Sequence, residues 1–269
     1  MHYVRGGRGA PPLIFVHGFA CDHTDWQFQL EKLKSSHEVV ACDLRGHGAT
    51  PGRPDECSID HYGGDVLALI NNLELAPAIP VGHSMGCRVV LEAARIAPQR
   101  VAGVVLIDGS RQGSGDPAQA EALSRSAILA AGYPVFVENV FRQMFLEWSR
   151  PAEAALARVK RMPAETGIAL WTCMVSWDGT TLEAALSSLR APLMVIQSTW
   201  INAGRKRLPL KEGEISPWLD LLQSRVPGAA IHVIPGVGHF AQLEAADEVN
   251  RLLSGFCARV RRPRPAIRL

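Results

Sequence analysis

The sequence predicts an α/β fold in which a mostly parallel sheet is flanked by helices and carries an inserted helical lid. Short apolar runs rich in β-branched residues alternate with segments of helical periodicity, which is the pattern of a parallel sheet covered on both faces. The alternation stops once, between residues 116 and 189, where helical stretches follow one another without strand runs. The predicted strands are residues 13–16, 39–42, 78–81, 104–107, 192–196 and 231–234.

The interruption divides the chain into a core and an insertion. We expect residues 1–115 and 190–258 to form one α/β core and residues 116–189 to form a helical lid. A separate helical domain is the alternative, but a segment of about 70 residues is small for an independent unit. Residues 259–269 carry several arginines and two prolines and are expected to form a basic, solvated C-terminal tail.

Composition limits the classes of function. The 269 residues include 28 basic and 26 acidic side chains, so no large basic excess exists to neutralise nucleic-acid phosphates. No membrane span is expected, because no run of about 18 apolar residues occurs, and the N-terminus lacks the apolar region of a secretory signal. The six cysteines include no C-x-x-C pair, which favours buried thiols in a reducing, cytoplasmic compartment. The expected partner is a small-molecule substrate, and the oligomeric state stays open, a homo-oligomer included.

The strongest chemical signal is a G-x-S-x-G motif around Ser84. Residues 82–86, GHSMG, directly follow a predicted strand and precede a helical pattern at 85–97, which is the context of a nucleophile elbow. The strained turn lifts the hydroxyl into a cleft, and the helix N-terminus presents backbone N–H groups to a developing oxyanion. Ser84 is the predicted nucleophile, and the N–H of Met85 is one predicted oxyanion donor.

Two loops at the same sheet edge supply a base and a second donor. A serine hydroxyl needs a base to take its proton, and His239 lies in a glycine-containing loop just after the last predicted strand. His239 is therefore the predicted general base. The HGF segment at 17–19 follows the first predicted strand, and the N–H of Phe19 is the predicted second oxyanion donor; an ordinary strand-ending turn is the alternative for this segment.

Four motifs together resemble the α/β-hydrolase superfamily, in the order typical of its members. They are HGF at 17–19, DLRGHG at 43–48, GHSMG at 82–86 and GVGHF at 236–240. The resemblance covers roughly residues 11–115 and 190–257 and is to the lid-bearing branch of esterases, lactonases, C–C bond hydrolases, haloperoxidase-like proteins and dehalogenases. It implies the fold and a Ser-His-acid triad and says little about the substrate.

The resemblance also implies an acid after the penultimate core strand, where residues 198–204 contain no Asp or Glu. A triad needs a carboxylate to orient the histidine and stabilise its cation. Asp108, which closes the predicted strand 104–107 at the same sheet edge, is the predicted replacement, and some branches of the superfamily place their acid there. The alternatives are Asp178 at the end of the lid, Glu212, Glu214 and Asp220.

Residues that contact the substrate are predicted from aromatic content. Trp148 and Trp177 of the lid, and Trp200 after the penultimate core strand, are the predicted contacts; packing within the lid is an equal alternative for the lid tryptophans. The basic segment 205–211 either steers an acidic substrate into the cleft or forms a solvated loop.

These residues predict a serine hydrolase that cleaves an ester, thioester or lactone of a small, largely apolar substrate through an acyl-enzyme. A C–C bond hydrolase acting on a diketone-like substrate would use the same residues. A cofactor-free oxygenase with a His-Asp dyad is another alternative, and so is a non-catalytic ligand-binding protein on the same fold. No metal or organic cofactor is expected, because neither a ligand cluster nor a phosphate-binding glycine loop is evident.

Overall fold

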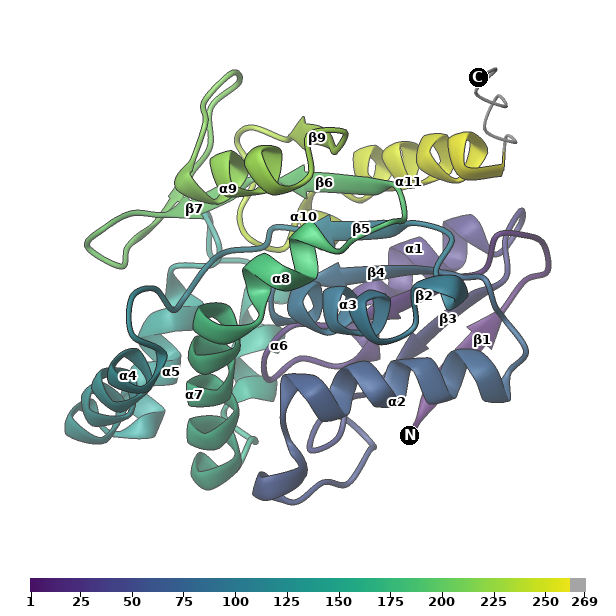
Figure 1. Ribbon diagram of the computed structural model, residues 1–269. Coiled ribbons are helices and arrows are strands. Elements are labelled where there is room, and N and C mark those ends of the chain that lie inside the picture. The colour runs from purple at the N-terminus through teal and green to yellow at the C-terminus, as the bar shows by residue number, and fades with distance from the viewer. Residues whose placement is uncertain (262–269) are drawn as a thin grey trace.

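The computed structural model describes residues 1–261 as a central sheet with helices on both faces (Figure 1). Within these residues the sheet has seven strands in the order β1-β3-β2-β4-β5-β6-β9. Only β1 pairs antiparallel among the strands of this sheet that the structure describes. The strands are β1 Tyr3–Gly6, β2 Leu13–Val16, β3 Val39–Cys42, β4 Ile79–His83, β5 Val104–Ile107, β6 Leu193–Gln197 and β9 Ala230–Val233. The mostly parallel sheet confirms the predicted fold class.

Alternate strand residues divide the core into two layers. Ile14 and Val16 of β2 pack into the layer that contains α2 and α3, whereas Leu13 and Phe15 pack into the layer that contains α1 and α11. Strands buried on both faces read as continuous apolar runs, which explains why these strands could be predicted. The core helices are α1 Gln27–Leu33, α2 Ile59–Asn72, α3 Met85–Ile96, α9 Pro217–Arg225, α10 Ala241–Glu244 and α11 Ala246–Arg261.

The predicted lid corresponds to the helical segment between β5 and β6. Its helices are α4 Pro117–Ala131, α5 Tyr133–Arg142, α6 Arg150–Val159, α7 Ala164–Thr180 and α8 Leu182–Ser187. The first of them begins at a cap, because the Asp116 carboxylate accepts a hydrogen bond of 2.7 Å from the N–H of Gln119. The last, α8, packs against α3 and so returns the chain to the core. In Figure 1 the helices α4, α5 and α7 lie at the left, on the same side as β7.

Three features are absent from the sequence prediction. In the edge strand β1, half of the residues are exposed and the other half are only partly buried. The apolar pattern that would predict this strand is therefore weak. A hairpin of β7 Thr199–Ile201 and β8 Arg207–Pro209 occupies a segment whose basic composition suggested a loop. Helix α11 continues to Arg261, so residues 259–261 are helical; the rest of the predicted tail, 262–269, lies outside the described residues. No helix of the described chain is long and apolar enough to span a membrane.

A buried ion pair ties the lid to the core. Arg88 of α3 donates from Nε and Nη2 to the two carboxylate oxygens of Asp178 in α7, at 2.8 and 2.7 Å, and both side chains are almost fully buried. Asp178 also accepts hydrogen bonds from the N–H groups of Gln112 and Gly113. Asp178 therefore holds together α3, α7 and the segment that follows β5.

Replacing Asp178 by asparagine is expected to lower the free energy of unfolding by about 3–5 kcal/mol, because it leaves the Arg88 charge buried without a counter-ion. Urea unfolding followed by circular dichroism measures this as a lower midpoint with an unchanged slope. The control is Asp55→Asn, which removes the acid of an exposed pair with Arg53 and should leave the midpoint where it is. Equal midpoints for the two variants would contradict the structural role of Asp178.

Candidate active site

Ser84 lies in a strained turn between β4 and α3. Its backbone has φ 54° and ψ −112°, a conformation that costs energy for a residue other than glycine and is common at functional sites. The flanking glycines are required by close packing: a Cβ on Gly82 would lie 2.2 Å from the carbonyl oxygen of Gly86, and a Cβ on Gly86 would lie 2.4 Å from that of Val16. The G-x-S-x-G motif thus forms a tight strand-to-helix turn that projects Ser84 from the sheet edge.

The turn that follows β2 lies beside Ser84. A Cβ on Gly18 would lie 3.2 Å from the Cβ of Ser84, so residues 17–19 pass directly by the nucleophile elbow. The ring of Phe19 packs edge-on against Trp171 at 5.3 Å between centroids. Met85 begins α3, and its N–H belongs to the first turn, whose N–H groups have no partner within the helix. The structure thus places the 17–19 turn and the start of α3 next to Ser84.

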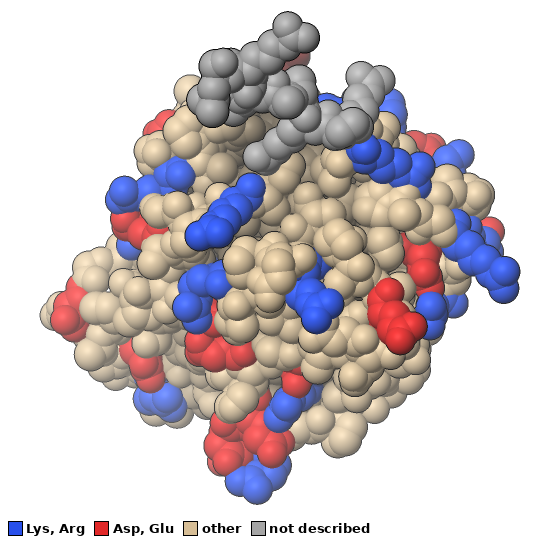
Figure 2. Space-filling model, turned by 45° about the vertical axis from the view of Figure 1, so that its right-hand side comes forward, with Lys and Arg blue, Asp and Glu red and all other residues tan. Residues whose placement is uncertain are grey.

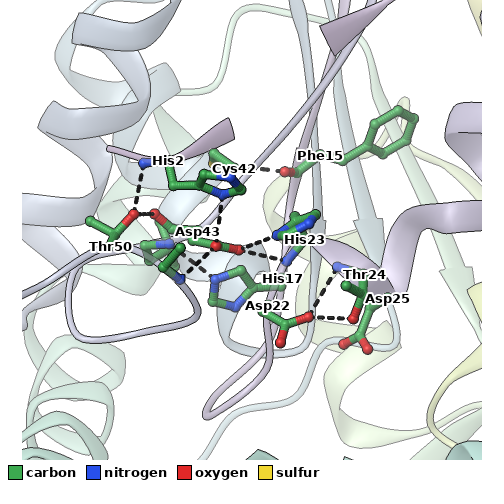
Figure 3. A network of polar contacts seen from close by, with 12 residues as sticks. His2, Phe15, His17, Asp22, His23, Thr24, Asp25, Cys42, Asp43 and Thr50 are labelled. Carbon is green, nitrogen blue, oxygen red and sulfur yellow. Dashed lines mark hydrogen bonds and ion pairs between the residues drawn. The ribbon is translucent and has the colours of Figure 1, made fainter. Parts of the chain in front are cut away.

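Asp43 organises the loops that support this turn (Figure 3). Its carboxylate accepts hydrogen bonds of 2.8 Å from the backbone N–H of His23 and 2.9 Å from that of Ala49. The Nδ1–H groups of His23 and His2 donate to the same carboxylate at 2.8 and 3.0 Å. His2, His23 and Asp43 place metal-ligand types within 4.8 Å of one another, but both Asp43 oxygens are taken by these hydrogen bonds. We therefore assign the cluster to holding the loops in place.

Asp108 contacts His239 at the end of β5. The Nδ1–H of His239 donates to Oδ2 of Asp108 at 2.5 Å, and Asp108 is fully buried with φ 45°. Its Oδ1 accepts the N–H groups of Ser198 and Thr199 at 2.8 and 2.7 Å, and its Oδ2 accepts the Thr199 hydroxyl at 2.5 Å. The segment after β6, which has no carboxylate of its own, thus holds the carboxylate supplied by β5.

Arg207 of the β7–β8 hairpin also reaches Asp108. Its Nη1 lies 3.3 Å from Oδ2 of Asp108 and donates to the Thr199 hydroxyl at 2.6 Å, and its side chain is only 7% exposed. Burial raises the pKa of Asp108, but the hydrogen bond and charge of His239 and the charge of Arg207 outweigh it, so this pKa is lowered. Burial and the Arg207 charge lower the pKa of His239 to about 4. His239 is then neutral at pH 7, as a general base requires.

The His239 loop is fixed from both sides. Its N–H donates to the carbonyl of Met144 in the lid at 2.6 Å, and its carbonyl accepts Nε2–H of His83 at 2.9 Å. The rings of His83 and His239 lie 4.6 Å apart. Burial lowers the pKa of His83 well below its ordinary value, so His83 acts as a neutral support. The Nε2 of His239 is buried and has no hydrogen-bond partner among residues 1–261, which leaves it able to accept a proton.

The alternative acids lie elsewhere. Asp178 is bound to Arg88, as described above. Glu212 and Asp220 are exposed, and Glu214 accepts the backbone N–H of Lys211 within its own loop. Among the predicted candidates, the structure therefore brings only Asp108 to His239.

A cavity of about 600 Å³ lies between the core and the lid, with Ser84 and Met85 in its wall. None of the three predicted tryptophans is among the residues that line it. Trp148 is 46% exposed, Trp177 is 3% exposed with its Nε1 3.4 Å from Glu92, and Trp200 belongs to β7. Trp171 lines the cavity instead.

For Trp177, helix geometry explains this correction. Trp171, Met174 and Val175 all line the cavity, and their spacing of three and four residues puts them on one face of α7. Trp177 follows Trp171 by six residues, which places it on another face, where it packs toward α3. The periodicity of α7 could have identified the lining face once the helix was known to border the cavity.

Comparison with known proteins identifies the family. Residues 13–252 match the family described as "Alpha/beta hydrolase family". The chain belongs to this family. The match confirms the resemblance found in the four motifs and the prediction of an α/β-fold hydrolase.

Curated relatives and solved structures extend this comparison. The chain is 30% identical over 263 residues to the dihydrolipoyllysine-residue acetyltransferase component of the acetoin cleaving system of Pseudomonas putida, covering 93% of this chain and 64% of that relative. The corresponding component of Cupriavidus necator is 32% identical over 262 residues, covering 94% and 65%. The chain thus spans just under two thirds of the length of these two relatives. A bifunctional esterase/perhydrolase of Acinetobacter calcoaceticus is 41% identical over 104 residues, 38% of each chain.

Two solved structures share the fold over nearly the whole chain. A thermophilic esterase from Thermogutta terrifontis superimposes with a TM-score of 0.78 at 23% identity, covering 97% of this chain and 94% of the other. An N-acyl homoserine lactone degrading enzyme superimposes with a TM-score of 0.76 at 24% identity, covering 95% and 96%. At these identities the similarity shows the fold.

Proposed function

We propose that the chain hydrolyses an ester, thioester or lactone of a small, largely apolar substrate through an acyl-enzyme on Ser84. The observation that carries the proposal is the contact between Asp108 and His239 at the sheet edge where the elbow presents Ser84. The names of the esterase relatives and structural neighbours support the same class of reaction. The apolar residues in the cavity wall support a substrate with an apolar body.

The proposed reaction has two steps. Ser84 Oγ attacks the carbonyl carbon while His239 Nε2 takes its proton, and the leaving alcohol, thiol or ring oxygen receives that proton. The N–H groups of Phe19 and Met85 stabilise the oxyanion of each tetrahedral intermediate. Asp108 stabilises the His239 cation. A water molecule, deprotonated by His239, then releases the acid and restores the Ser84 hydroxyl.

Labelling with a fluorophosphonate tests the nucleophile. We expect one covalent adduct per chain, located on Ser84 by mass spectrometry, because an activated serine reacts with this electrophile and ordinary hydroxyls do not. Ser110, Ser114 and Ser124 line the same cavity and provide internal controls within the same digest. An adduct on one of these serines would contradict Ser84 as the nucleophile. No adduct on folded protein would count against a serine hydrolase and favour the oxygenase or the non-catalytic ligand-binding alternative.

A substrate panel tests the reaction class. It contains aryl esters, lactones, an acetyl thioester and a diketone; the thioester is included because two relatives are named as acetyltransferase components. Turnover of esters, lactones or the thioester is expected. Turnover of the diketone alone would replace the proposal with C–C bond hydrolysis by the same residues.

The pH dependence of kcat/KM should reflect the environment of His239. A base is active only when it is neutral, so activity is full above its pKa and is lost as the pH falls through it. Because the pKa of His239 is lowered to about 4, the acid limb is expected below pH 6.5. Arg207→Gln removes a positive charge that lowers this pKa and should move the limb upward. Lys211→Gln, an exposed change in the same segment, should leave it in place; equal shifts in both variants would contradict the prediction.

A further inference from the structure

The wall of the cavity carries basic side chains and no acidic ones. Arg88, Arg205 and Arg207 line it, and no Asp or Glu of the described chain does. On the face of the molecule in Figure 2, by contrast, basic and acidic side chains alternate. The cavity therefore departs from the mixed pattern seen on that face.

Two of these three arginines have a carboxylate partner behind the wall. Arg88 donates two hydrogen bonds to the carboxylate of Asp178. Arg207 lies 3.3 Å from Asp108, whose oxygens also bind His239. Because His239 is neutral at pH 7, the two arginine charges are balanced by the charges of the two aspartates.

Arg205 is the arginine without a counter-ion. No Asp or Glu oxygen lies within 4 Å of its guanidinium among residues 1–261. It donates instead to two neutral oxygens of Gln112, the backbone carbonyl at 3.0 Å and the side-chain Oε1 at 2.5 Å. A guanidinium has five N–H donors, so these contacts leave donors available. Arg205 is exposed as a whole residue, and burial of part of its side chain lowers its pKa.

The fold directs Arg205 toward the cavity. Arg205 lies in the β7–β8 turn with φ 61°, and its N–H donates to the carbonyl of Asn202 at 2.9 Å. Gln112, which anchors its guanidinium, is itself held by a hydrogen bond from its N–H to Asp178. Arg205 and the next residue, Lys206, are both exposed, but only Arg205 lines the cavity. Adjacent basic residues of one turn thus face different surroundings, as expected if only Arg205 serves a ligand.

We propose that Arg205 binds a carboxylate of the substrate. The preferred esters or lactones would then carry a free carboxylate in addition to the ester bond, together with an apolar body. This inference rests on the proposed hydrolase function and names its substrate class. A planar guanidinium matches a carboxylate in shape and can bind it through two parallel hydrogen bonds. The single uncompensated positive charge calls for one negative charge, which favours a carboxylate over a phosphate dianion. The apolar side chains of Leu123, Phe136 and Trp171 in the same wall would contact the remainder of the molecule.

Matched esters test the proposal. Mono-4-nitrophenyl succinate, glutarate and adipate are compared with 4-nitrophenyl butanoate, pentanoate and hexanoate, in which a methyl group replaces the carboxylate. The pair 4-acetoxybenzoate and 4-methylphenyl acetate places the charge on the leaving group instead. The readout is the ratio of kcat/KM for the anionic and neutral ester of each pair, measured in the wild-type chain and its variants.

For the best pair of esters, the ratio of anionic to neutral kcat/KM is expected to be about ten- to a hundredfold lower in Arg205→Gln than in the wild-type chain. This is the loss expected for a hydrogen bond to a charged group. Arg205→Lys should restore part of it, since the charge returns without the planar fork. Lys206→Gln should keep the wild-type ratio, because that side chain does not line the cavity. The same ratio in wild type and Arg205→Gln, with neutral esters turned over, would overturn the carboxylate proposal and leave the hydrolase function standing.

A binding measurement separates the two proposals further. Glutarate is titrated by calorimetry into the wild-type chain, Arg205→Gln and Lys206→Gln, without any reaction. Weaker binding in Arg205→Gln alone would support carboxylate recognition even if no ester were hydrolysed, in which case the hydrolase function would fail by itself. Equal binding in all three proteins, or no binding in any, together with unchanged kcat/KM ratios would overturn the role of Arg205.

Discussion

Replacing Ser84 by alanine is expected to lower kcat for the best ester of the panel by about 10⁶-fold, the size of effect seen when a triad nucleophile is removed. The reason is that no acyl-enzyme can form, and the residual rate comes from the oxyanion donors and substrate binding. Steady-state kinetics with a 4-nitrophenyl ester, followed at high enzyme concentration, measures the loss. Alanine fits the turn at least as easily as serine, so circular dichroism and the unfolding midpoint should not reveal a folding defect.

The matched control for this variant is Ser110→Ala. Ser110 lines the same cavity but is not in the elbow, so its kcat is expected to change by less than about tenfold. A small loss in Ser84→Ala, or a larger loss in Ser110→Ala, would show that Ser84 is not the nucleophile.

Replacing Asp108 by asparagine is expected to lower kcat by about 10⁴-fold, with a smaller change in KM. Asparagine keeps the shape of the side chain but removes the charge that stabilises the His239 cation. Its amide group also changes the hydrogen bonding at Nδ1 of His239, which favours the wrong tautomer for proton transfer. Kinetics on the same ester, together with the rate of fluorophosphonate labelling, measure the effect, and both are expected to fall.

Asp178→Asn serves as the comparison for Asp108→Asn. It also neutralises a buried carboxylate that faces an arginine, but Asp178 lies away from His239. We expect it to lower the unfolding midpoint while retaining most of the kcat of the folded protein. If Asp108→Asn labelled at the normal rate and Asp178→Asn did not, the triad acid would have to be reassigned.

Much of the fold could be predicted because its signals are local. Strands β2, β3, β5 and β6 are short runs of mostly apolar residues that are buried on both faces. The elbow needs only a strand, two glycines and a helix in sequence. The edge strand β1 and the β7–β8 hairpin lack such a pattern. Residues 199–201 and 207–209 become strands by pairing with each other. A segment of three residues is too short for a pattern of alternating apolar residues to predict such a strand.

By itself, the sequence determined the elements that carry Ser84, Asp108 and His239 and the family to which the chain belongs, because each depends on neighbouring residues. Only the tertiary structure decided how the candidate acids are used. Asp108 and His239 are 131 positions apart, and the N–H groups of residues 198 and 199 fix Asp108 in place, while Asp178 is taken by Arg88. Which lid face lines the cavity, and where Arg205 and Arg207 lie in its wall, follow from packing between distant segments, which local sequence patterns do not encode.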